Sequence, residues 1–225
     1  ADAGTPEPPI LRRILCAAFF LSGAAALADE SLWVRGLGLV FGTAAPAVSA
    51  TLTLFLGGLG LGAAVFGRVA DRVVSPLRLL AYLEIGAAAL VALSPAGFQL
   101  AGSVVALGGE APGPFAWFAV RFAAGAAILL PPTILMGGTL PAIARWFVRR
   151  EQDVAVDVGR LYAWNTIGGA VGALLAAHLL IEHLGPTRGL FASAALHAAV
   201  GVAFLLIARR VDGPGEGIAA VAGRG

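Results

Sequence analysis

The feature that most constrains the fold of this chain is an uncharged apolar run over residues 44–66. A helix of about 23 residues rises ~1.5 Å per residue, which is enough to cross the ~30 Å hydrocarbon core of a bilayer. The whole chain is similar in character, since 59% of its 225 residues are hydrophobic and only 12% are charged. Soluble domains carry about 25% charged residues. The sequence therefore predicts an all-α integral membrane protein.

Other apolar runs extend this prediction to a bundle of about six transmembrane helices over residues 12–210. We expect the first helix over residues 14–28, where Asp29 and Glu30 end the apolar run. Residues 31–43 are predicted to be interfacial, because Trp33 is of a type that favours the headgroup level. The later helices are expected over 44–66, 76–93, 115–148, 158–181 and 188–208. Cytoplasmic tails are expected over 1–11 and, Gly-rich, over 211–225.

Prolines and glycines mark the ends and bends of these helices. Ser75 before Pro76 is typical of an N-cap followed by proline at the first helical position. Residues 94–114 are predicted to be a loop that ends where Pro114 begins the next helix. Residues 115–148 would span roughly 50 Å as one helix. We therefore expect one helix with a break between Pro131 and Gly138, and not two crossings.

Arginine placement predicts the orientation. All 15 basic residues are Arg, and positive residues near span ends favour the cytoplasm. Six crossings put most of them on one side, so both termini are predicted to be cytoplasmic. The arginines assigned to that side are Arg12, Arg13, Arg68, Arg72, Arg78, Arg145, Arg149, Arg150, Arg160, Arg209, Arg210 and Arg224. Their scattering in small groups beside apolar segments argues against a nucleic-acid partner, despite a net charge of +2.

Glycines four residues apart predict close helix packing. Gly58 and Gly62 lie in one expected span, and Gly168 and Gly172 lie in another. Such pairs allow two backbones to approach closely. We interpret them as internal packing positions, and a homodimer face is the alternative.

Three polar residues inside expected spans are candidate substrate-binding residues: Glu84, Arg121 and Asn165. Ionisable groups in lipid are costly and mark a functional site by default. We expect Glu84 and Arg121 to face the bundle interior and to reach each other. They form either a structural ion pair or a polar site at mid-depth in which Glu84 attracts a cation. Asn165 needs a hydrogen-bonding partner, which another helix can supply without any function.

Cofactor and metal chemistry is not expected. Cys16 is the single cysteine, which excludes an intrachain disulfide or a cysteine cluster. His178, His183 and His197 show no metal-ligand spacing, and no catalytic triad or phosphate loop can be argued. We therefore predict no metal site, no cofactor and no catalytic residue.

Two short motifs resemble those of the major facilitator superfamily. The link between spans two and three reads Gly67-Arg68-Val69-Ala70-Asp71-Arg72, similar to its Gly-x-x-x-Asp-Arg signature, and Arg121-x-x-x-Gly125 is similar to its Arg-x-x-x-Gly element. The resemblance implies one six-helix half of that fold. It also implies a cytoplasmic charge latch of Arg68, Asp71 and Arg72, although a solvated turn explains these residues equally well.

Residues 19–185 resemble, in order and spacing, the membrane region of bacterial fused major facilitator and spermidine synthase-like proteins. The segments that carry this resemblance are Phe19-Phe20-Leu21-Ser22-Gly23, Leu32-Trp33-Val34-Arg35, Leu39-Val40-Phe41-Gly42, Pro131-Pro132-Thr133, Met136-Gly137-Gly138-Thr139-Leu140-Pro141 and Gly159-Arg160-Leu161-Tyr162-Ala163-Trp164-Asn165-Thr166. Members of that family continue into a soluble aminopropyltransferase-like domain. This chain has no nucleotide-binding strand–glycine loop–helix unit, so we do not expect it to be an enzyme.

Two functions are expected from these observations. The first is a transporter-like module of the bacterial inner membrane, which handles a small, polyamine-like cation for a separate aminopropyltransferase-like partner chain. The second is a structural membrane subunit of a larger complex, with no substrate of its own. An acidic cavity would favour the first function, and a bundle covered by other chains would favour the second.

Overall fold

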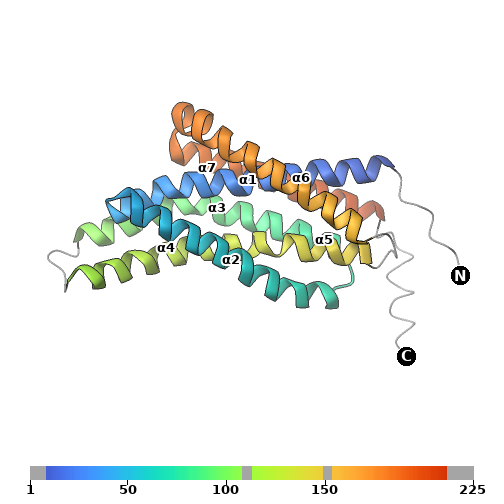
Figure 1. Ribbon diagram of the computed structural model, residues 1–225, viewed down its shortest axis with the longest axis horizontal. Helices are drawn as coiled ribbons and strands as arrows, with labels where there is room; N and C mark the ends of the chain where they lie inside the picture. Colours follow the sequence, from blue (N-terminus) through green and yellow to red (C-terminus); the bar gives the residue numbers. More distant parts are fainter. Residues whose placement is uncertain (1–8, 108–112, 149–153, 212–225) are drawn as a thin grey trace, which may run out of the picture.

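The computed structural model describes residues 9–107, 113–148 and 154–211, and all regular structure within these ranges is helical. Figure 1 shows an elongated bundle of long helices. In chain order they are α1 (Pro9–Phe41), α2 (Ala44–Arg72), α3 (Pro76–Leu107), α4 (Pro114–Gly137), α5 (Thr139–Val148), α6 (Val154–Leu175), the π-helix η1 (Ala176–Leu184) and α7 (Gly185–Val211). The all-α prediction is confirmed for these residues. The expected tails at 1–8 and 212–225, and parts of two expected connections at 108–112 and 149–153, lie outside them.

Within the described ranges, five helical stretches are long and apolar enough to cross a membrane. They are Ile10–Phe41, Ala44–Arg72, Pro76–Leu107, Phe115–Phe147 and Ala155–Val211. The last stretch has 57 residues and contains Gly185, whose φ of 75° reverses the chain in a conformation that favours glycine. Figure 1 shows α6 and α7 running in opposite directions along the bundle.

Helix α1 is much longer than predicted. It continues past Asp29 to Phe41, so the expected end at residue 28 is wrong, and most of the segment over 31–43 is part of the same helix. Asp29 is fully buried and contacts His197 of α7, which provides a partner that a lipid-facing carboxylate would lack. Gly42, with φ 76°, ends the helix by donating its N–H to the carbonyl of Gly38 at 2.9 Å.

Helix α3 is also longer, because Pro95 does not end it. The expected loop over 94–114 is helical as far as Leu107. Proline cannot donate to the carbonyl four residues earlier, here that of Val91. The Ser94 hydroxyl replaces that donor at 2.7 Å. Ser94 Oγ in turn accepts the indole N–H of Trp33 at 3.0 Å, so Trp33 is a core residue and not an interfacial one.

The predicted bend of the fourth span is confirmed. Helix α4 ends at Gly137 and α5 begins at Thr139, and Figure 1 shows the two lying end to end in one direction. The expected caps are also present. Pro76 and Pro114 begin α3 and α4, and the Ser75 hydroxyl accepts the N–H of Arg78 at 3.2 Å. The expected link after residue 66 is helical up to Arg72, which leaves a short connection over 73–75.

The glycine pairs lie where helices touch. A Cβ on Gly168 or Gly172 of α6 would meet the α1 backbone at Phe20 or Ala24. A Cβ on Gly58 or Gly62 of α2 would meet α4. Internal packing is therefore confirmed for both pairs, and the glycines are needed for the close approach of the two backbones.

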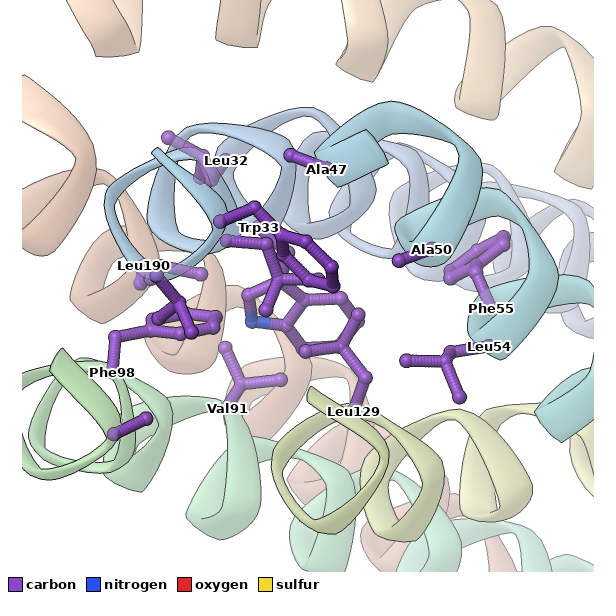
Figure 2. Close-up of a cluster of buried hydrophobic side chains, with 14 of the residues drawn as sticks. Leu32, Trp33, Ala47, Ala50, Leu54, Phe55, Val91, Phe98, Leu129 and Leu190 are labelled. Atoms are coloured by element: carbon purple, nitrogen blue, oxygen red, sulfur yellow. The ribbon is translucent and has the colours of Figure 1, made fainter. Parts of the chain in front are cut away.

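The core consists of two hydrophobic clusters. One surrounds Trp33, which Figure 2 shows among side chains that include Val91 and Leu129. The other includes Phe19, Leu80 and Phe204. Many large apolar side chains point outwards instead, among them Leu56 at 62% and Leu100 at 67% exposure. A surface of this kind suits lipid, and the protein is best described as a multi-pass membrane protein by the length and composition of its helices.

Candidate functional site

A cluster of ionisable side chains lies inside the bundle, where α1, α3 and α7 meet. His197 of α7 bridges two carboxylates: its Nδ1 is 2.7 Å from Oε2 of Glu84 on α3, and its Nε2 is 3.2 Å from Oδ2 of Asp29 on α1. The Ser22 hydroxyl of α1 donates to Oε1 of Glu84 at 2.5 Å. We call Ser22, Asp29, Glu84 and His197 the carboxylate–histidine cluster.

The cluster separates the two hydrophobic halves of the core. Along α3, Leu80 belongs to one hydrophobic cluster and Val91 to the other, and Glu84 lies between them. Along α7, His197 likewise lies between Leu190 and Phe204. Asp29, Glu84 and His197 are 0–1% exposed. The cluster is thus an ionisable layer across the middle of an otherwise apolar bundle.

The two contacts of His197 set the smallest number of protons that the cluster can hold. Each nitrogen–oxygen contact needs one proton, since a lone pair on each atom would repel. Either an imidazolium donates to two carboxylates, or a neutral imidazole donates to one carboxylate and accepts from a carboxylic acid. The first arrangement sums to −2 + 1 = −1, and the second has one carboxylate and also sums to −1. With only these two protons one negative charge remains in the buried site, and a further proton on Oδ1 of Asp29 or Oε1 of Glu84 would neutralise it.

Asp29 offers an unsatisfied acceptor in this site. Its Oδ1 is buried and has no hydrogen-bond partner within the described ranges. Ser193 of α7 lies beside Asp29, but its hydroxyl donates to the carbonyl of Ala25 at 3.2 Å. A buried acceptor without a donor costs free energy. An additional proton or a cationic group would therefore be stabilised most at Oδ1 of Asp29.

The expected pairing of Glu84 with Arg121 is wrong, although Glu84 does face the interior as predicted. Arg121 donates to the carbonyl of Phe41 at 3.4 Å and lies 5.6 Å from the centre of the Trp117 ring. The extension of α1 brings its last carbonyls, which lack helical partners, to Arg121. His197 meanwhile occupies the position beside Glu84. Arg121 is part-buried, and the contacts described above join it to Phe41 and Trp117 and not to the cluster. It therefore does not complete a site with Glu84.

Asn165 joins α6 to α1 and not to the cluster. Its amide donates to the carbonyl of Phe19 at 3.1 Å, and a Cβ on Gly23 would meet the backbone of Asn165. This is the interhelical hydrogen bond that an amide in lipid requires, and it secures the close α1–α6 contact.

The residues of the expected latch make separate contacts within the described bundle. Asp71 pairs with Arg145 of α5 at 3.3 Å, while Arg68 donates to the carbonyl of Ala64 in its own helix at 2.9 Å. Arg72 is exposed at the end of α2. Asp71 therefore links α2 to α5 within this bundle.

Sequence reasoning missed Asp29 and His197 as site residues. Two signals were available: Ser22 and Asp29 are seven residues apart, which places them on one face of a helix, and His197 lies in the middle of an uncharged run. Reading Asp29 as the end of the first span concealed the first signal. Nothing in the sequence pairs His197 with Asp29 and Glu84, because the three lie on separate helices.

A metal site is not formed by these residues. The described part of the chain contains no group of three His, Cys, Asp or Glu side chains arranged to hold a metal ion. The reason is visible in the cluster, where the carboxylates approach opposite nitrogens of the imidazole ring and share no common point.

No protein-family model, curated protein or solved structure matches this chain significantly. The function of this chain is therefore inferred from the carboxylate–histidine cluster itself.

Proposed function

We propose that this chain is a transporter-like membrane module that binds a small organic cation at Asp29 and Glu84. The observation that carries the proposal is a pair of buried carboxyl groups, Asp29 and Glu84, bridged by the imidazole of His197. An uncompensated charge in a membrane interior is costly and is usually retained for function. A cation that enters between the carboxylates replaces His197 as their partner.

Charge balance favours a diamine as the ligand. Two carboxylates and one ammonium group still sum to −1, whereas two carboxylates and two ammonium groups sum to zero. The unsatisfied Oδ1 of Asp29 and the Oε atoms of Glu84 provide acceptors for N–H groups at two ends of a short chain. This choice agrees with the sequence resemblance to spermidine synthase-like fusion proteins, and it implies a separate aminopropyltransferase-like chain that uses the ligand.

We propose further that the module crosses the bacterial inner membrane six times, with both ends in the cytoplasm. The support is the reversal at Gly185 within a 57-residue helical stretch, together with the arginine asymmetry. The described beginning of α1 and the end of α7 lie at the same end of the bundle in Figure 1. In a Cys16→Ser background, introduced cysteines at Thr5 and Gly215 should both resist an impermeant maleimide in intact cells. External labelling of either would contradict this topology.

Equilibrium binding of labelled putrescine to the full chain in nanodiscs tests the cation site. Asp29→Asn and Glu84→Gln should each abolish saturable binding, since each removes one of the two charges that hold the ligand. Glu30→Gln is the matched control, because Glu30 lies beside Asp29 in sequence but makes no contact with the cluster among the described residues. It should bind as the parent does.

His197→Gln separates binding from folding. If the imidazole competes with the ligand for the carboxylates, removing it should tighten putrescine binding provided that the protein remains folded, which thermal unfolding of the same sample reports. Binding that is unchanged in Asp29→Asn and Glu84→Gln, or absent from the folded parent protein, would refute the cation site.

A structural subunit is the second candidate. It is favoured by one observation, namely that the cluster joins three helices while its residues are only 0–5% exposed. In that case, the parent protein binds no putrescine and co-purifies in mild detergent with stoichiometric partner chains. Asp29→Asn would then lower thermal stability and partner retention together.

A further inference from the structure

A second feature, independent of the carboxylate–histidine cluster, lies between α1 and α6 at the arginine-rich end. The two helices meet closely where Gly23 faces Asn165 and where Gly168 faces Phe20. Both helices begin at the same end of the bundle and cross in Figure 1. Towards their beginnings they leave a groove of about 770 Å³.

The lining of this groove changes from charged to apolar along the helices. Arg12 and Arg13 of α1 and Arg160 of α6 lie at its mouth, and the apolar part is lined by Ala17, Leu21 and Trp164, among others. Phe20 and Trp164 meet edge to face with ring centres 6.2 Å apart. At ~1.5 Å per residue, Trp164 lies about one turn from Arg160, and Leu21 lies ~12 Å from Arg13.

Among the residues that the structure describes, those at the mouth of the groove carry excess positive charge. Asp157 is buried and takes Arg12 as its partner at 3.1 Å, with Arg160 farther away at 3.9 Å. Three arginines and one aspartate sum to +2. Arg13 is exposed and the Arg160 side chain is 52% exposed, so both guanidinium groups can approach a ligand. Guanidinium groups bind phosphate through paired N–H donors.

We propose that this groove is a binding site for one anionic phospholipid. Its phosphate lies against Arg13 and Arg160, and one acyl chain lies over Ala17, Leu21 and Trp164. A free anion would use the arginines alone and leave the apolar lining uncovered. A zwitterionic lipid would bring its own cation to a mouth that is already positive. The order from charge to hydrocarbon along the groove matches that of an anionic lipid.

The single cysteine provides a native reporter, because Cys16 lines the groove. With the full chain in mixed micelles, dioleoylphosphatidylglycerol should slow maleimide labelling of Cys16 in a saturable manner. Dioleoylphosphatidylcholine and inorganic phosphate should not. Equal protection by phosphatidylcholine would show a general lipid contact, and protection by inorganic phosphate would show a simple anion site. Either result would overturn the proposal.

Variants test the two parts of the site separately. Arg13→Gln with Arg160→Gln should weaken phosphatidylglycerol binding about tenfold or more, a change of ~1.4 kcal/mol per factor of ten, measured by native mass spectrometry. The matched control is Arg209→Gln with Arg210→Gln, which removes two exposed arginines at the end of α7, outside the groove. An equal loss in the control would show non-specific attraction and contradict the site.

The apolar part is tested by Ala17→Trp, which fills the groove at an exposed position without changing charge. It should lower phosphatidylglycerol affinity while leaving the thermal unfolding temperature unchanged. If affinity is retained, no acyl chain lies in the groove and the proposal fails. Arg13→Gln alone is the milder charge variant should the double variant unfold.

Discussion

Carboxylates pair with basic side chains both in the interior of the bundle and at its arginine-rich end, but the surroundings of the two kinds of pair differ. In the interior, Asp29 and Glu84 share His197, and all three side chains are 0–1% exposed. At the end, Asp71 pairs with Arg145, and these side chains are 66% and 33% exposed. Water weakens the second pair and also solvates either partner when the other is lost. The interior offers neither screening nor solvation, so the same kind of contact matters far more there.

The largest effect is expected from His197→Leu, which leaves two buried carboxylates without their shared partner. We expect a loss of about 3–5 kcal/mol in the free energy of unfolding, measured by denaturant titration in mixed micelles. Combining it with Asp29→Asn and Glu84→Gln should recover much of that loss. His178→Leu, at an exposed position of η1, is the control and should change stability by less than ~0.5 kcal/mol. A small effect of His197→Leu would show that the interior contacts stabilise the fold no more than the exposed Asp71–Arg145 pair does.

The glycines extend the comparison to backbone packing. Gly168→Ala places a Cβ against the carbonyl of Phe20 and should cost about 1–3 kcal/mol of unfolding free energy, because neither backbone can move freely. Gly159→Ala, in the same helix near the arginine-rich end, meets nothing within 4 Å and should be neutral or slightly stabilising. The same titration measures both. Equal effects at the two positions would mean that α1 and α6 are not in close contact.

Asp157 is an intermediate case. It is 5% exposed, yet its partners Arg12 and Arg160 have side chains that are 38% and 52% exposed. Asp157→Asn should therefore cost about 1–2 kcal/mol, between the values for exposed and buried pairs. Raising the salt concentration should reduce this loss by a larger fraction than it reduces the loss caused by His197→Leu, because the two arginines remain hydrated. A salt-independent loss would place Asp157 with the interior residues instead.

The smallest effect is expected for the exposed pair. A double-mutant cycle of Asp71→Asn and Arg145→Gln should give a coupling of about 0.2–1 kcal/mol at low salt. That coupling should shrink further at 0.5 M salt, where the screening length is only a few ångströms. A coupling above ~3 kcal/mol would show that this pair is buried in the membrane-embedded protein.

Local sequence signals predicted the helix starts and the bend well. Ser75 and Pro76 specify the beginning of α3, and Gly138 specifies the break between α4 and α5, because each acts through its own backbone geometry. The helix ends at residues 28 and 93, just before Asp29 and Ser94, were predicted wrongly. Asp and Ser usually end a helix when their side chains are solvated or point outwards. Inside this bundle, His197 pairs with Asp29, and the Val91 carbonyl accepts the Ser94 hydroxyl.

The sequence also identified Glu84 as an interior ionisable residue but assigned it the wrong partner. Arg121 was the nearest opposite charge by helical depth, and depth along one helix says nothing of which face meets which neighbour. The actual partner, His197, lies 113 positions away on α7. Its role depends on the crossing of three helices, which local pattern does not encode.

Hydrophobic run length and proline and glycine placement by themselves determined that this chain forms long apolar helices with specified starts and bends. These properties follow from the backbone and from the solvent that each segment prefers. The tertiary structure alone decided that Asp29, Glu84 and His197 meet in one buried site, and that α1 and α6 separate to leave an arginine-lined groove. Both outcomes depend on the angles and faces at which distant helices meet, and those are set by packing across the whole bundle.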